Sequence, residues 1–70
     1  MVDMQYVDSS NIEAVGFDGD AGELVVQFLS GKTYTYSGVP EETFLALLAS
    51  NSKGSFLNRE IKGVYAYAET

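Results

Sequence analysis

The sequence contains no cysteine and no histidine, and only one proline. Without cysteine there are neither disulfides nor thiolate ligands for a metal, and without histidine as well a structural zinc site of the usual kind is excluded. Packing alone must therefore stabilise the fold, and we expect neither a metal nor a cofactor. The same absences remove the usual acid–base group of neutral pH and the thiol nucleophile, so we expect no enzyme activity.

Long apolar runs are also missing. The longest, Phe44 to Ala49, is far shorter than the roughly 20 residues that a membrane span needs. The N-terminal segment carries Asp3 and Asp8, where a targeting signal would have basic residues followed by an apolar stretch. With 70 residues, 46% of them hydrophobic, the chain suffices for one small core with a thin stability margin. We expect a soluble, cytoplasmic protein.

Positive charge is scarce and unevenly placed. The chain has 4 Lys and Arg against 10 Asp and Glu, and residues 1–31 contain neither Lys nor Arg. In residues 32–70 the two signs cancel, so the net charge of −6 lies entirely in residues 1–31. Because nucleic-acid binders usually show the opposite sign, the charge disfavours nucleic acid as a partner. It leaves open a local contact through Lys53, Arg59 and Lys62.

Alternating apolar residues predict three strands. Within the first, the apolar positions change parity, which a bulge near Ala14 would explain. The second strand is apolar on both faces, because Val25 and Leu29 lie on the side opposite Leu24. Its second face is therefore expected to be covered by the C-terminal tail or by another chain. The strands are predicted at residues 11–18, 23–29 and 33–37.

Two helices are predicted after the strands. The first begins at Pro40, which lacks only a donor that would be unpaired there, and carries an apolar stripe within Phe44–Leu48. The second has Ser55 as its N-cap and runs to about Ile61, with Gly63 as its exit.

Together these elements predict an α+β fold. It is a three-stranded antiparallel β-meander, or a four-stranded one if the alternating Val64–Tyr67 adds an edge strand instead of lying as a tail. One longer and one short C-terminal α-helix pack on one face. We expect a flexible lead-in at residues 1–9, a single domain at residues 10–67 and a tail at residues 68–70.

The order of short motifs from Asn11 to Ile61 is more specific than any one of them. The motifs are Leu24–Phe28, Ser30-Gly31, Tyr34-Thr35-Tyr36, Val39-Pro40-Glu41-Glu42 and Ser52-x-Gly54-x-Phe56-x-Asn58-x-x-Ile61. This order resembles the KTSC family, small domains named for their similarity to the C-terminal extension of some lysyl-tRNA synthetases. The resemblance implies a small domain for which RNA binding is the suggested activity. It also implies that Asn58 ties its helix to a turn through hydrogen bonds.

One region departs from the family pattern. Many members of the family that this chain resembles are richer in basic and aromatic residues around the second helix, where this sequence has Leu57, Glu60 and Lys62. This difference weakens the inference that this chain binds RNA as suggested for the family.

Tyr34 and Tyr36 share one strand face and allow two interpretations. As binding groups they would stack on nucleotide bases or anchor a peptide. As structural groups they would fill a half-buried sheet face under the first helix, with their hydroxyls at the rim. We favour the structural interpretation.

The basic residues of the second half also allow two interpretations. Arg59 and Lys62 share a helix face at i, i+3 and could form an anion site together with Lys53. Alternatively they are ordinary surface charge, with Arg59 offset by Glu60. We favour surface charge.

The leading hypothesis is a small, non-catalytic interaction module that binds a protein partner or a second copy of itself, through the doubly apolar strand and the uncovered Val64–Tyr67. The alternative is an RNA- or nucleic-acid-binding module that uses the Tyr-x-Tyr strand and the basic patch. A small-molecule or nucleotide pocket between helix and sheet is a third hypothesis, which the sequence does not reveal. The candidate interaction residues are Tyr34, Tyr36, Lys53, Arg59, Lys62, Tyr65 and Tyr67.

Overall fold

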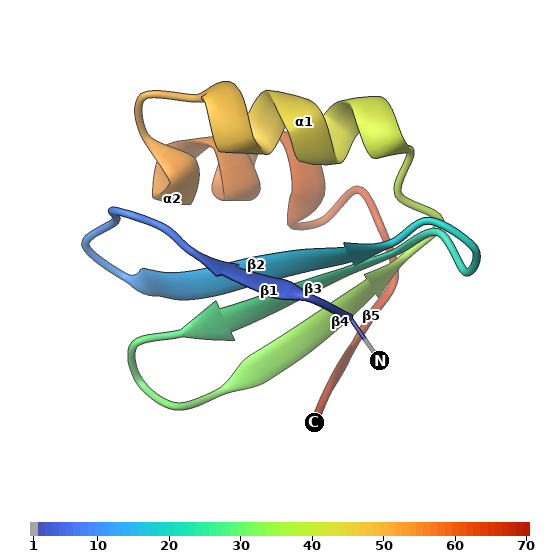
Figure 1. Ribbon diagram of the computed structural model, residues 1–70, viewed down its shortest axis with the longest axis horizontal. Coiled ribbons are helices and arrows are strands. Elements are labelled where there is room, and N and C mark those ends of the chain that lie inside the picture. Colours follow the sequence, from blue (N-terminus) through green and yellow to red (C-terminus); the bar gives the residue numbers. More distant parts are fainter. Residues whose placement is uncertain (1) are drawn as a thin grey trace.

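A helical layer covers one face of an antiparallel sheet in the computed structural model, which describes residues 2–70 (Figure 1). Within these residues the sheet has five strands, in the order β1-β2-β3-β4-β5. Each strand pairs with the next strand in the sequence, and the helices lie between β4 and β5 in the chain. The strands are β1 (Met4–Tyr6), β2 (Ile12–Asp18), β3 (Glu23–Phe28), β4 (Thr33–Ser37) and β5 (Tyr67–Glu69).

The three central strands confirm the predicted meander to within one residue at each end. The register between β2 and β3 shifts between Ile12 and Ala14, so the bulge predicted from the change of parity is present. The shift lets Ile12 and Val15 both face the helices, where each is fully buried. Continuous pairing would send one of them to the opposite face.

The two outer strands correct the prediction of a three- or four-stranded sheet. Residues 1–9, predicted as a lead-in, contain β1, whose Gln5 lies opposite Val15 of β2. Strand β5 runs from Tyr67 to Glu69. It therefore begins at the last residue of the predicted edge strand, Val64–Tyr67, and extends into residues 68–70, which were predicted as a tail. The C-terminal segment therefore extends the sheet, and does not cover the second face of β3 as one alternative proposed.

The helices are α1 (Glu41–Ala49), α2 (Lys53–Phe56) and the π-helix η1 (Leu57–Ile61). Pro40 stands at the N-cap of α1, one residue before the predicted helical position. The predicted cap of the second helix is wrong, because Ser52 holds that position. Its Oγ accepts a hydrogen bond from the Ser55 N–H at 3.4 Å. The helix therefore begins at Lys53, earlier than predicted.

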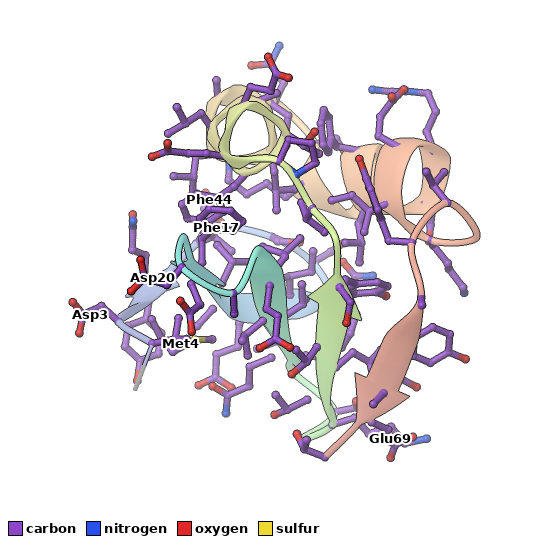
Figure 2. All side chains as sticks on the ribbon, turned by 90° about the vertical axis from the view of Figure 1, so that its right-hand side faces the viewer. Asp3, Met4, Phe17, Asp20, Phe44 and Glu69 are labelled. Atoms are coloured by element: carbon purple, nitrogen blue, oxygen red, sulfur yellow. The ribbon has the colours of Figure 1, made fainter. Side chains whose placement is uncertain are left out.

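The core lies between the helices and the inner face of the sheet. Phe17 of β2 stacks on Phe44 of α1, with ring centroids 5.3 Å apart (Figure 2). Leu47 and Ile61 are fully buried and join both helical segments to the same core. In a chain without cysteine or histidine, this single apolar cluster supplies most of the stabilising burial.

Candidate functional site

The described residues form a cleft of about 350 Å³ between the β3–β4 hairpin and η1. The hairpin contributes one wall and its turn, η1 contributes the opposite wall, and the connection between β1 and β2 closes the end. We call this site the hairpin cleft. It is lined by Asn11, Phe28, Ser30, Lys32, Tyr34, Tyr36, Leu57, Asn58 and Lys62.

The central tyrosines have different exposure although they share one strand face. Tyr36 is 2% exposed and belongs to the core, whereas Tyr34 is half-buried. Their ring centroids are 6.4 Å apart with nearly perpendicular planes, and Phe28 meets Tyr34 edge-on at 5.4 Å. Burial, followed by the neighbouring phenols of Tyr34 and Tyr67, raises the pKa of Tyr36. The interpretation of Tyr36 as a packed structural group is therefore confirmed, while Tyr34 remains accessible from the cleft.

The two tyrosines of the C-terminal segment take separate positions. Tyr67 of β5 lies opposite Tyr36 in the sheet register, and its ring centroid is 5.2 Å from that of Tyr34. Tyr67 is nonetheless 60% exposed. Tyr65 is half-buried and packs against the core from the turn before β5. The aromatic cluster thus continues from the cleft to the edge of the sheet.

The predicted basic patch is divided by the fold. Lys62 lines the cleft, but the Lys53 ammonium donates to the Ser50 carbonyl at 3.0 Å. The Arg59 guanidinium pairs with Glu60 at 2.9 Å and lies over the Phe56 ring, 5.7 Å from its centroid. Because the Arg59–Glu60 pair is well exposed, it contributes little stability.

Lys32 is the basic residue that sequence reasoning missed. It follows the Ser30-Gly31 turn and lines the cleft together with Lys62, from the opposite wall. The turn reverses the chain, with Phe28 and Lys32 joined by a backbone hydrogen bond of 2.8 Å. The signal available in the sequence was its place in the turn immediately before Tyr-x-Tyr.

Two asparagines supply amide groups to the cleft. The Asn11 Oδ1 accepts a hydrogen bond of 3.1 Å from Ser9 Oγ, which leaves its NH₂ group available to donate. Asn58 was predicted to tie its helix to a turn. It is exposed and lines the cleft, and among residues 2–70 its side chain makes no hydrogen bond that would form such a tie.

Acidic charge gathers at the opposite end of the sheet. The β2–β3 turn carries Asp18, Asp20 and Glu23, and in a meander successive turns lie at opposite ends of the shared strand. The Val39 N–H donates to the Gly22 carbonyl at 2.9 Å, which brings the acidic start of α1 to the same end. The net charge of −6 is thus polarised away from the cleft.

Metal-binding groups and membrane-spanning helices were also sought among residues 2–70. Within residues 2–70, no group of three or more His, Cys, Asp and Glu side chains is placed to hold a metal ion. No helix in that span has the length and apolar character needed to cross a membrane.

The fold and the cleft define a small α+β domain, in which an antiparallel meander carries its helices on one face. The chain belongs to the KTSC family, since the KTSC domain model matches residues 8–65. The crystal structure of a KTSC domain protein from Yersinia pestis has the same fold, with a TM-score of 0.97 and 36% identity over 100% of this chain and 99% of that chain.

Two further relatives are similar over most of their length. A protein of Tsukamurella paurometabola is 48% identical over 59 residues, which cover 84% of this chain and 88% of the relative. An uncharacterized protein of Stutzerimonas stutzeri is 39% identical over 54 residues, which cover 77% of this chain and 76% of the relative. These similarities agree with the family match.

Proposed function

We propose that this domain is a non-catalytic interaction module that associates with a second copy of itself through the free edge of β5. The observation that carries the proposal is the direction of the β5 backbone groups. The Ser37 N–H donates to the Ala66 carbonyl and the Thr70 N–H donates to the Thr33 carbonyl, both at 2.8 Å. Backbone direction alternates along a strand, so the N–H and C=O groups of Tyr67 and Glu69 point away from β4.

The β5 edge is more open than the β1 edge. All three residues of β5 are exposed, and Val64 beside it is 61% exposed (Figure 2 shows Glu69 at the end of this strand). Two exposed carboxylates, Asp3 and Asp8, flank β1, whereas β5 carries one, Glu69, at its end; charges of this kind oppose edge pairing. The geometry therefore favours strand addition at β5.

A second copy fits this edge because antiparallel pairing is self-complementary about a two-fold axis. With the axis at Ala68, Tyr67 of each copy would lie opposite Glu69 of the other. The two Glu69 carboxylates would then lie diagonally and not directly opposite each other, which lessens like-charge repulsion across the pair.

Light scattering after size exclusion, at several protein concentrations, tests the proposal. The mass of the native protein should rise toward that of a dimer as concentration increases. Glu69→Pro removes an outward N–H and should give a monomer, whereas Glu69→Gln keeps that N–H and should still associate. Tyr6→Pro removes an outward N–H from β1 and should leave association unchanged. A native protein that is monomeric at every concentration would overturn the proposal.

Binding of single-stranded RNA is a second candidate, favoured by the position of Lys62 on the same cleft as Tyr34. Its support is narrower than the sequence suggested, since Tyr36 is packed and Arg59 is paired with Glu60. If RNA binds, Lys62→Gln should weaken it more than Arg59→Ala, with an affinity that falls as salt rises. A low-salt gel-shift titration checks this order.

A further inference from the structure

The hairpin cleft has the dimensions of a small-ligand site. Its volume of about 350 Å³ lies at the lower end of the range of roughly 300–1,000 Å³ that such sites occupy. It is open to solvent and bounded by two separate elements, the β3–β4 hairpin and η1. A cleft of this size accommodates one compact molecule and not several linked units.

The charges at the cleft favour an anion. Lys32 and Lys62 are exposed and approach it from opposite walls. Among residues 2–70 the structure contains one ion pair, between Arg59 and Glu60, so neither cleft lysine is neutralised by a carboxylate within pairing distance. Because the acidic turn lies at the other end of β3, an approaching anion meets the less acidic end of the molecule.

The remaining lining favours a planar ring with polar edges. Phe28 and Tyr34 offer aromatic surface from the hairpin, and Leu57 adds aliphatic surface from η1. Asn11 and Asn58 supply amide groups, which donate and accept hydrogen bonds at the edge of a heterocycle. Aromatic walls with a few polar groups are the usual composition of a site that selects one orientation of a flat ligand.

We propose that the hairpin cleft binds a free nucleoside monophosphate, with its phosphate between Lys32 and Lys62 and its base against Phe28 and Tyr34. The cleft lining contains no residue of β5, although the Tyr34 ring contacts that of Tyr67. Ligand binding and self-association are therefore measured by different experiments, and either can fail without the other. A ring without a phosphate would leave both ammonium groups unpaired, and phosphate alone would leave the aromatic wall unused. Both parts of the ligand are therefore needed for full affinity.

Titration of ¹⁵N-labelled protein with adenosine monophosphate tests this site by NMR. The amide signals of Asn11, Lys32 and Asn58 should move together along one binding curve. Adenosine and inorganic phosphate, titrated separately, should each bind at least about tenfold more weakly, because each lacks one half of the contacts. A fourth titration, with a short single-stranded oligoadenylate, compares the mononucleotide with a nucleic-acid strand.

Charge-removing variants locate the phosphate. Lys32→Gln and Lys62→Gln should each weaken binding of adenosine monophosphate by about tenfold. Lys53→Gln is the matched control and should leave the affinity unchanged, since the Lys53 ammonium donates to the Ser50 carbonyl. Because Lys32 and Lys62 are exposed, we expect both variants to fold as the native protein does. The dispersion of their amide signals checks this.

Three results would overturn the proposal. The first is the absence of movement of the cleft signals at millimolar adenosine monophosphate. The second is movement confined to residues outside the cleft. The third is an oligoadenylate that binds the cleft much more tightly than the mononucleotide, which would identify a nucleic-acid strand as the ligand instead.

Discussion

The side-chain oxygen Oδ1 of Asn11 lies 2.8 Å from the point where a Cβ on Gly54 would be placed. The Asn11 side chain therefore brings the connection between β1 and β2 close to the start of α2. The hydrogen bond from Ser9 Oγ holds Oδ1 in that place. A side chain at residue 54 would therefore displace Asn11, so the missing Cβ fixes the position of one wall of the hairpin cleft.

Replacement of Gly54 by alanine should have different effects in two backgrounds. In the native chain the new methyl group displaces the Asn11 side chain, which offsets the helix preference of alanine, so Gly54→Ala should bring no gain in stability. In the Asn11→Ala chain the same change should stabilise the fold by up to about 1 kcal/mol, the helix preference of alanine over glycine. Urea unfolding of the four proteins of this double-mutant cycle measures the coupling. Equal effects in both backgrounds would show that Asn11 does not impose the glycine.

The cap of α2 can be tested by comparing two serines. Ser52→Ala should cost about 1 kcal/mol of unfolding free energy, because the Ser55 N–H loses its acceptor. Ser55→Ala should cost less, since it removes only the exposed hydroxyl–hydroxyl contact of 3.0 Å with Ser52. Thermal or urea unfolding checks the order. The reverse order would restore Ser55 as the cap, as the sequence had suggested.

The central strands and α1 could be predicted because each buries one face in a regular period. Leu24 and Val26 alternate along β3, and Phe44 and Leu47 recur at helical spacing. Strand β1 has no such period, because it is an edge strand of three residues whose Gln5 and Tyr6 are both exposed. Its pairing depends on the neighbouring strand, which a local pattern does not reveal.

The hairpin cleft was less predictable than the fold. The sequence indicates Tyr34 and Lys62 as candidate interaction residues. Their position on the same cleft depends on how η1 packs against the hairpin. Lys32 lay in a turn, where a single lysine is usually solvated. Lys53 and Arg59 were grouped with Lys62 by sequence distance, whereas each is engaged by a residue close to it in the chain. Local partners decide which charges remain available, and they depend on side-chain conformations that spacing alone does not fix.

Strand β1 should be released by Gly16→Ala. A Cβ at residue 16 would lie 2.5 Å from Val2 Cγ1 and 2.8 Å from the Asp3 carbonyl oxygen. The second of these is a backbone atom, so relief requires movement of the segment that leads into β1. We expect faster hydrogen exchange at Val7, whose N–H donates to the Glu13 carbonyl at 3.1 Å, and unchanged exchange in β3. Gly19→Ala, where a Cβ meets nothing closer than 3.9 Å, is the matched control.

For that variant, exchange rates are informative even if the domain is destabilised as a whole. Global unfolding would accelerate exchange in β1 and β3 alike, whereas release of the edge strand accelerates β1 alone. If the Val7 amide of Gly16→Ala exchanged at the same rate as in the native protein, this result would contradict the close packing of residues 2–4 over Gly16.

The buried phenol of Tyr36 should make the domain less stable in alkaline solution. Burial, followed by the neighbouring Tyr34 and Tyr67, raises its pKa above the ordinary value of 10.0. In the unfolded chain the phenol ionises near that ordinary value, while in the folded protein it stays protonated to higher pH. The unfolded state therefore binds fewer protons in this interval, and the free energy of unfolding falls as pH rises through it. Below the pKa of Tyr36 in the unfolded chain, this residue causes no loss of unfolding free energy.

Melting temperatures from about pH 8 to about pH 11 measure this effect in the native protein and in Tyr36→Phe. The variant keeps the ring contacts but cannot ionise at residue 36, so its melting temperature should fall less steeply at the alkaline end. Tyr6→Phe is the matched control, because Tyr6 is 81% exposed, and it should follow the native curve. Parallel curves for the native protein and Tyr36→Phe would show that burial of this phenol does not govern the alkaline loss of stability.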